Sequence, residues 1–281
     1  MFIKSPLNYT GGKFKLLSQL LPLFPQDMHT FVDLFCGGCN VGINVQADRV
    51  IFNDITPQLY DLYRQWQKDG YDNTIQYVEN RIQHFQLSKT NEAGFLQLRE
   101  TYNAERDIRD LFVLIAYAFN HQIRFNSAGN FNMPFGRNRS EFNKTMKKNL
   151  EDFVNQIVSS TYVFMNQSFE QLDLSALTPA DFVYCDPPYL ITTASYNEND
   201  GWNEACEYKL LGLLDQCNAR GIRFGLSNVL ENKGRKNDIL IEWIDKNNYK
   251  VHHLHMTYGN CNYHALDKSV GTTDEVLITN Y

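Results

Sequence analysis

Strand-like apolar runs fall into two groups, and the long stretch between the groups contains none. The first group is at residues 30–35 (TFVDLF) and 49–53 (RVIFN), and the later runs are at 161–165, 181–185, 223–227 and 276–280. Residues 57–160 instead repeat apolar side chains at helical spacing. Strands alternating with helices on both sides of an insertion predict one α/β, doubly wound sheet, interrupted by a mostly helical domain.

Several features indicate where a chain of 281 residues like this one works. The longest apolar run, residues 111–119, is too short for a membrane span of ~20 residues. The first residues have no apolar core followed by a small-residue cleavage site. The six cysteines are scattered, which argues against a disulfide scaffold. We therefore expect a cytoplasmic protein with no membrane partner.

Positive charge is concentrated in residues 120–150, although the whole chain is acidic. This segment has six basic side chains and one acidic side chain, a net of +5, whereas the total formal charge is −6. Contact with nucleic acid requires such a local basic surface, whatever the total charge. A solvated charged face would have the same composition, so charge alone does not decide between the two.

The motif Asp186-Pro187-Pro188-Tyr189 directly follows an apolar strand. The prolines end the strand and stiffen the turn, at the edge where open α/β sheets bind ligands. The Asp186 carboxylate and the Pro187 carbonyl are both acceptors, and together they could hold the two hydrogens of an exocyclic amine. The Tyr189 ring could stack on the base that carries this amine. An ordinary strand-ending turn is the alternative.

A second motif surrounds the first two strands. Gly37 and Gly38 follow the first strand, which contains Asp33, and such glycines let a backbone approach a ligand closely. Asp54 ends the second strand, at a spacing where an acid commonly binds ribose hydroxyls. This order predicts a strand, glycine loop, helix and strand that open a parallel sheet. Without a full GxGxxG, dinucleotide binding is not indicated, and Phe14 after Gly-Lys excludes a P-loop.

These motifs occur in a recognisable order along nearly the whole chain. They are Tyr-Thr-Gly-Gly-Lys at 9–13, Phe-x-Asp-x-Phe-x-Gly-Gly at 31–38 and Asp-Pro-Pro-Tyr at 186–189. Together they resemble the Dam-like, alpha-group N6-adenine DNA methyltransferases. Residues 124–137 resemble the DNA-reading stretch of that family, and 275–281 resemble its closing strand. Two departures, Asp33-Leu34-Phe35 for Glu-Pro-Phe and Cys39 for a third glycine, lie in the cofactor loop.

The resemblance implies a Rossmann-like methyltransferase fold with a doubly wound mixed sheet. Residues 1–56 and 161–281 would form the catalytic domain and 57–160 a helical target-recognition domain. The implied reaction transfers a methyl group from S-adenosyl-L-methionine to N6 of an adenine flipped out of double-stranded DNA, within a short recognition sequence. The implied catalytic residues are Asp186, Pro187 and Tyr189. The implied cofactor-binding residues are Tyr9, Lys13, Asp33, Gly37, Gly38, Asp54 and Asp186.

The basic loop then becomes the candidate DNA reader. The implied DNA-binding residues are Asn120, Gln122, Arg124, Pro134, Arg137, Lys147 and Lys148. Arginine is the commonest bidentate reader of guanine, so Arg124 and Arg137 are the candidate base readers. The two lysines are expected at phosphates. We expect the aromatic residues Tyr117, Phe119 and Phe125 to pack within the helical domain rather than stack on bases.

Alternative functions remain open. The substrate could be RNA adenine or a protein amide, although Asn-Pro-Pro-Tyr would be more typical of amide methylation. An inactive DNA-binding relative is a further alternative, which the intact Asp186, Asp54 and Lys13 argue against. The sequence does not disclose the recognition site, and a cognate restriction endonuclease acting on that site without direct contact is compatible with it.

No metal site is expected. Cys36 and Cys39 have the spacing of zinc ligands but lack a second cysteine pair. The histidines at 252, 253 and 255 lie on a run that alternates like a strand, so their side chains should point to both faces. Cys261 and His264 are the remaining residues of that region that could be imagined as ligands.

Overall fold

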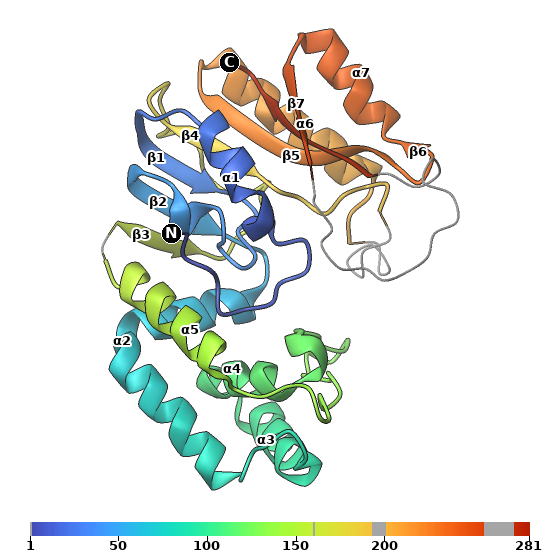
Figure 1. The fold of residues 1–281 in the computed structure, drawn as a ribbon. Helices are drawn as coiled ribbons and strands as arrows, with labels where there is room; N and C mark the ends of the chain where they lie inside the picture. The colour runs from blue at the N-terminus through green and yellow to red at the C-terminus, as the bar shows by residue number, and fades with distance from the viewer. Residues whose placement is uncertain (1, 160, 193–200, 256–272) are drawn as a thin grey trace. The chain divides into compact units, whose positions relative to one another are not determined.

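The structure is a computed structural model, and it describes residues 2–159, 161–192, 201–255 and 273–281 (Figure 1). Backbone packing divides the chain into two compact units. The first, here called the helical unit, comprises Met1–Phe14, Gly37–Asn44 and Thr56–Asn166. The second, here called the sheet unit, comprises Lys15–Cys36, Val45–Ile55 and Gln167–Tyr281. The predicted insertion at 57–160 lies in the helical unit, and its role as a target-recognition domain stays a prediction.

The sheet unit is built on a mixed sheet. Its strands are β1 (Met28–Asp33), β2 (Ala47–Asn53), β4 (Phe182–Cys185), β5 (Arg223–Asn232), β6 (Arg235–Lys236), β7 (Lys250–Leu254) and β8 (Thr273–Thr279). They lie in the order β2-β1-β4-β5-β8-β7, with β6 paired to β5. β1, β2, β4 and β5 are parallel, whereas β8 is antiparallel to both β5 and β7. The predicted α/β class with a mixed sheet is confirmed.

Both faces of this sheet are covered. Successive residues of a strand face opposite ways, and Phe182 and Tyr184 of β4 pack on Phe24, with ring centroids 5.1 and 5.4 Å apart. Phe224 of β5 is in register with Val183, on the other face, and its ring stacks on Trp243 at 6.0 Å. The helices of this unit are α1 (Leu17–Leu20), α6 (Glu204–Ala219) and α7 (Asp238–Asn247). This arrangement explains why the central strands read as continuous apolar runs.

The predicted helix between the first two strands is wrong. Only a 3-10 turn, η3 (Gly42–Asn44), lies between β1 and β2. Gly37 and Cys39 adopt positive φ values of 45° and 59°, which a right-handed helix cannot accommodate. The leucine-rich segment 13–23 forms three short helical pieces, η1 (Lys13–Leu16), α1 and η2 (Leu21–Leu23).

The helical unit surrounds an apolar central helix. Its elements are α2 (Pro57–His84), α3 (Glu92–Glu105), α4 (Ile108–Tyr117), η4 (Phe119–His121), α5 (Lys144–Ile157) and the short strand β3 (Tyr162–Met165). Asn91, Asp107 and Asn143 cap α3, α4 and α5 by accepting backbone N–H bonds. Positions 110–117 of α4 are all buried, so this helix forms the core of the unit.

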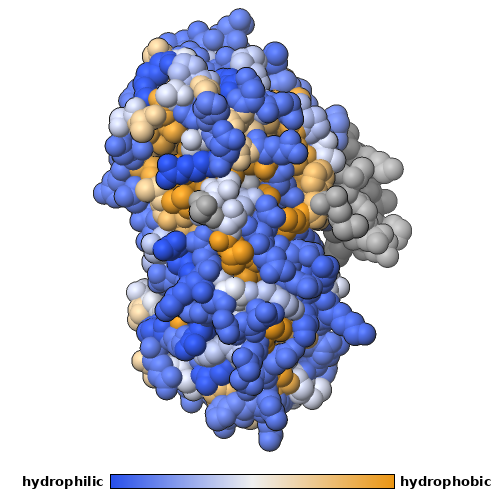
Figure 2. Space-filling model, turned by 90° about the vertical axis from the view of Figure 1, so that its left-hand side faces the viewer, coloured by the Kyte–Doolittle hydropathy of each residue, from blue (hydrophilic) through white to orange (hydrophobic). Residues whose placement is uncertain are grey.

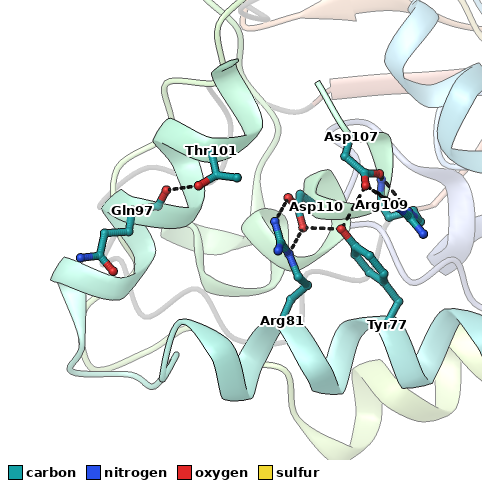
Figure 3. A network of polar contacts seen from close by, with 7 residues as sticks. All are labelled: Tyr77, Arg81, Gln97, Thr101, Asp107, Arg109 and Asp110. Carbon is teal, nitrogen blue, oxygen red and sulfur yellow. Dashed lines mark hydrogen bonds and ion pairs between the residues drawn. The ribbon is translucent and has the colours of Figure 1, made fainter. Parts of the chain in front are cut away.

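A polar network ties α2 to the start of α4 (Figure 3). The side chain of Asp110 is fully buried, and its carboxylate accepts bonds from Arg81 Nε at 2.7 Å and Arg81 Nη2 at 2.5 Å. Tyr77 donates to Asp110 Oδ1 at 2.9 Å. Burial and then the charge of Asp110 raise the pKa of Tyr77, so the hydroxyl stays a donor. Arg109 pairs with Asp107 beside this network at 2.6 Å.

Most of the face drawn in Figure 2 is hydrophilic, with apolar residues confined to small areas. Within the described parts of the chain, every helix is too short or too polar to cross a membrane.

Candidate functional site

Three carboxylates follow three adjacent parallel strands. Asp33 ends β1 and is in register with Phe52 of β2 and with Tyr184 of β4. Asp54 and Asp186 each come two residues after those partners. The three side chains therefore belong to the same carboxyl edge of the sheet, where α/β proteins bind ligands. Asp33 is buried, with 2% of its surface exposed, whereas Asp54 and Asp186 are half-buried.

A buried amide fixes the backbone at this edge. Asn53 Nδ2 donates to the carbonyls of Leu34 and Gln167 at 3.1 and 3.0 Å. Its Oδ1 accepts from the amide of Gln167 at 3.1 Å, and its own carbonyl accepts from Cys36 at 2.8 Å. Sequence reasoning missed Asn53, although a polar residue at the end of the apolar run RVIFN was a usable signal.

The Asp-Pro-Pro-Tyr turn leaves the end of β4, and its tyrosine contacts two acids. Tyr189 donates to Asp186 Oδ1 at 2.9 Å and to Glu275 Oε1 of β8 at 3.3 Å. A phenol has one proton, so it serves one carboxylate at a time, and the shorter distance favours Asp186. Burial, followed by the charges of Asp186 and Glu275, raises the pKa of Tyr189 well above its usual value. The hydroxyl therefore stays protonated and orients the carboxylate.

Glu275 is a second carboxylate that contacts this turn, and sequence reasoning did not assign it. It lies on β8 with 6% of its surface exposed. A buried acid is unusual unless it is paired or hydrogen-bonded, and one of its partners is the Tyr189 hydroxyl. The only sequence signal was its position at the start of the closing strand.

Three aromatic rings pack together next to the loop that follows β1. Phe35, Phe169 and Trp202 have ring centroids 5.5 to 5.7 Å apart. Phe169 and Trp202 are buried, whereas Phe35 is half-buried. The rings are tilted or edge-on to one another, so they form a packed apolar cluster in the sheet unit, and Phe35 is its partly exposed member. The cluster was not predicted, because its members lie far apart in the sequence.

A buried acid holds Trp202. Its indole Nε1 donates to Glu207 Oε2 at 2.8 Å, and Glu207 Oε1 accepts from Asn237 at 3.0 Å and Asn228 at 3.3 Å. Burial raises the pKa of Glu207, and the three donors act in the opposite direction. The network joins α6, β5 and the N-cap of α7.

In the helical unit, Tyr9 lies directly on the glycine loop. A Cβ added at Gly37 would be 2.8 Å from Tyr9 Cδ1, and one at Gly38 would be 3.2 Å from Tyr9 Cβ. Gly37 also has a φ of +45°, and its carbonyl accepts from the Tyr63 hydroxyl at 2.6 Å. Only glycine meets both the space and the backbone requirement here.

The segment that carries Tyr9 is itself anchored. Asn40 Oδ1 accepts from the amide of Ser5 at 3.0 Å. Lys13 is 4% exposed, and its Nζ donates to the carbonyl of Gly11 at 3.0 Å. Sequence reasoning missed Asn40, the asparagine within CGGCNVG.

Most of the predicted DNA contacts belong to one hairpin, here called the 117–136 hairpin. Its two arms are joined by bridges at Ala118–Phe135 and Phe125–Phe131 and by the bonds Phe119 N to Pro134 O and Gly136 N to Tyr117 O. The candidates that it brings together are Asn120, Gln122, Arg124 and Pro134. Arg124 is exposed and donates across the hairpin, from Nε to Asn132 Oδ1 and from Nη2 to Asn132 O, both at 2.8 Å.

The other predicted contacts are cations paired with acids. Arg137 is exposed and pairs with Glu92 of α3. Lys147 and Lys148 lie on α5 rather than on the hairpin, and pair with Glu79 at 2.6 Å and Asp152 at 2.7 Å. The acids raise the pKa of both lysines, which stay charged. Exposed pairs of this kind are weak, so an arriving phosphate can compete for the cations.

One aromatic expectation is wrong. Tyr117 is buried and Phe125 packs against Phe131, but Phe119 is 37% exposed, with the Arg139 guanidinium 4.8 Å from its ring centroid. The reason is local, since α4 ends at Tyr117 and Asn120 turns the chain with a φ of 54°.

Among the described residues, no cluster of three or more histidine, cysteine or acidic side chains could hold a metal ion. On β7, His252 contacts Thr279 at 3.3 Å, whereas His253 pairs with Asp274 at 2.7 Å. Cys261 and His264 lie outside the described residues.

Comparison with known proteins agrees with this arrangement. The family described as "D12 class N6 adenine-specific DNA methyltransferase" matches residues 9–259. Modification methylase StsI of Streptococcus sanguinis and Type II methyltransferase M.FokI of Planomicrobium okeanokoites are each 46% identical over 284 residues, which is 100% of this chain and 43% of each relative. The DNA adenine methylase of Haemophilus influenzae is 28% identical over 193 residues, 65% of this chain and 63% of that protein. The chain thus spans less than half the length of the first two relatives. It belongs to the D12 class of N6 adenine-specific DNA methyltransferases, as its motifs predicted.

Proposed function

We propose that this chain transfers a methyl group from S-adenosyl-L-methionine to N6 of an adenine in a short sequence of double-stranded DNA. The observation that carries the proposal is the Asp186-Pro187-Pro188-Tyr189 turn at the carboxyl edge of the parallel strands, with the Tyr189 hydroxyl 2.9 Å from Asp186. Membership of the D12 class supports the choice of adenine N6 as the acceptor.

The donor set fits S-adenosyl-L-methionine. Asp54 suits ribose hydroxyls, since it follows the second parallel strand. Tyr9 packs so closely on Gly37 that a Cβ has no room, so these two proposed cofactor-binding residues lie together. When bound, this group supplies an electrophilic methyl on a positively charged sulfonium. The proposed binding residues are Tyr9, Lys13, Asp33, Gly37, Gly38, Asp54 and Asp186.

Catalysis would rest on holding the amine. The N6 lone pair of adenine is conjugated with the ring, which makes it a poor nucleophile. Hydrogen bonds from N6 to the Asp186 carboxylate and the Pro187 carbonyl would favour a tetrahedral nitrogen. Tyr189 would orient that carboxylate through its hydroxyl and offer its ring face to the flipped base. The work of the protein is thus positioning and electrostatics.

The 117–136 hairpin is the proposed reader of DNA sequence. Arg124 and Arg137 are exposed, and a guanidinium fork matches the major-groove edge of guanine. Asn120, Gln122 and Pro134 belong to the hairpin together with Arg124, and Arg137 directly follows it. Lys147 and Lys148 would contact phosphates. Because two relatives are named a modification methylase and a Type II methyltransferase, we also infer a role beside a restriction endonuclease that acts on the same site without contacting this chain.

The test is methyl transfer to DNA by the Asp186→Ala variant. Plasmid DNA from a host that expresses the wild-type protein should contain N6-methyladenine at one short sequence. Asp186→Ala should abolish transfer from radiolabelled S-adenosyl-L-methionine while its circular dichroism stays that of the wild type. Asp173→Ala is the matched control, because Asp173 is exposed and bonds only locally to Ser175. Near-normal turnover by Asp186→Ala would overturn the assignment.

A further inference from the structure

One face of α3 holds one arm of the 117–136 hairpin. Arg99 and Asn103 are four residues apart, so they share a face of α3, and Arg106 is the C-cap residue directly after the helix. Arg99 Nη1 donates to Met133 O at 3.3 Å, and Asn103 Nδ2 donates to Phe131 O at 3.1 Å. The last donor of the row, Arg106 Nη1, lies 2.6 Å from the carbonyl oxygen of Gly129. We call these three side chains the α3 clamp.

The geometry of helix and hairpin explains why the contacts repeat. The carbonyls of Phe131 and Met133 belong to alternate residues, which point the same way along an extended chain, whereas Gly129 lies in the turn of the hairpin with a φ of 73°. One helical turn rises about 5.4 Å. Two extended residues rise about 6.7 Å, so Arg99 and Asn103 stay in step with Met133 and Phe131. Arg106, after the end of the helix, reaches the turn at Gly129.

The middle contact is two-sided. Asn103 Oδ1 also accepts from the amide of Phe131 at 2.8 Å, so its amide group pairs with that backbone as a neighbouring strand would. Arg106 makes a second bond as well, to the side chain of Asn130.

The backbone at Arg106 is strained in a way that serves the contact. It has φ 59° and ψ 26°, the left-handed conformation that glycine commonly supplies at the end of a helix. A residue with a Cβ is disfavoured there unless its surroundings hold it. The side chain of Arg106 is what reaches the hairpin, which gives a reason for arginine instead of glycine at this position.

The clamp is connected to a candidate base reader. Asn132 lies between the two clamped residues Phe131 and Met133, and its amide donates to the carbonyl of Arg124 at 3.1 Å. The guanidinium of Arg124 returns two bonds to Asn132. Movement of the clamped arm would therefore move Arg124.

We propose that Arg99, Asn103 and Arg106 are positioning residues for sequence recognition, which set the placement of the hairpin and of Arg124 without touching DNA themselves. This inference rests on the proposed function of the hairpin as the DNA reader. It assigns specificity to a helix face that precedes the basic segment in the sequence.

Arg106→Gly separates positioning from folding. Glycine relieves the left-handed backbone, so the melting temperature should not fall, while both bonds of Arg106 to the hairpin are lost. Cognate duplexes are first selected from a randomised pool by the wild-type protein. The preference for the cognate duplex over one changed at a single base pair, measured by equilibrium binding, should then fall about tenfold. Thr101→Ala is the control, because its hydroxyl bonds to Gln97 O within α3 at 3.0 Å (Figure 3).

A second variant gives a readout that needs no DNA. Asn103→Leu should increase hydrogen exchange at the Phe131 amide, whereas Thr101→Ala should leave that exchange unchanged. The inference would be overturned if both Arg106→Gly and Asn103→Leu discriminated between the duplexes as well as the wild-type protein does. It would also be overturned if Asn103→Leu left hydrogen exchange at the Phe131 amide unchanged. If the wild-type protein selects a duplex but transfers no methyl group to it, the proposed function fails, and the binding comparison still decides the role of the clamp.

Discussion

The strength of the Arg81–Asp110 pair in the helical unit follows from its burial. Asp110 has no exposed side-chain surface and Arg81 is 22% exposed, whereas in the neighbouring Arg109–Asp107 pair the two side chains are 42% and 28% exposed. Both pairs bind through two guanidinium nitrogens at similar distances. Burial therefore distinguishes two pairs that share the same two-nitrogen bonding geometry.

Arg81→Met should lower the free energy of unfolding of the helical unit by about 3 kcal/mol. Removing one partner of a buried ion pair costs about 3–5 kcal/mol, because the other charge stays buried. The lower end applies here, since Tyr77 still donates to Asp110. Arg109→Met, the matched control, should cost less than about 1 kcal/mol, the usual value of an exposed pair.

The free energy of unfolding of both variants is measured by urea unfolding. The transition is followed by far-UV circular dichroism and by the fluorescence of Trp66, a buried residue of α2. Replacing both partners, as in Arg81→Met combined with Asp110→Leu, should restore most of the loss because no unpaired charge remains. Equal costs for Arg81→Met and Arg109→Met would refute the reasoning from burial.

Three further predictions concern the sheet unit and the hairpin. Burial raises the pKa of Glu207 above 4.5, so the folded state binds this proton more tightly, and the unfolding free energy should fall as pH rises from 4.5 through the raised pKa. Glu207→Gln should flatten that part of the urea-unfolding profile, and an unchanged slope would contradict the assignment. Asp54→Ala should weaken S-adenosyl-L-methionine binding about 10- to 100-fold in calorimetry, the loss expected for hydrogen bonds to a charged group, while DNA affinity without cofactor stays the same. Arg124→Ala should cost ~1–3 kcal/mol mainly on the cognate duplex, whereas Lys147→Ala should weaken all duplexes and lower the salt slope by about one unit; equal losses on every duplex for Arg124→Ala would reduce the hairpin to an electrostatic anchor.

Local signals predicted the sheet and its edge well. Apolar runs marked β1, β2, β4 and β5, because strands covered on both faces have few polar positions. The two prolines that follow Asp186 marked the end of β4. The sequence did not reveal that no helix lies between β1 and β2. The positive φ at Cys39 depends on how the loop is packed rather than on residue type.

Residues that act through distant partners escaped prediction. Glu275 contacts Tyr189 across 86 positions of the chain, and Trp202 meets Phe35 only in the folded sheet unit. Neither contact has a local pattern, since the residues come together through strand order. The α3 clamp was missed for the same reason: Arg99 and Asn103 read as ordinary exposed positions of an amphipathic helix.

The sequence by itself determined the class of chemistry. A carboxylate, two prolines and a tyrosine after a buried strand specify which groups are present and at which end of the strand they lie, and covalent order cannot change that. Only the tertiary structure decided how those groups are satisfied. The same residue type has different roles at Arg81, Arg106 and Arg137, which hold a buried acid, a backbone carbonyl of the hairpin and an exposed acid. Charge and hydrogen-bonding capacity are properties of a side chain, but burial and partner are properties of the packed chain. Burial and partner set how much the side chain contributes to the free energy of unfolding.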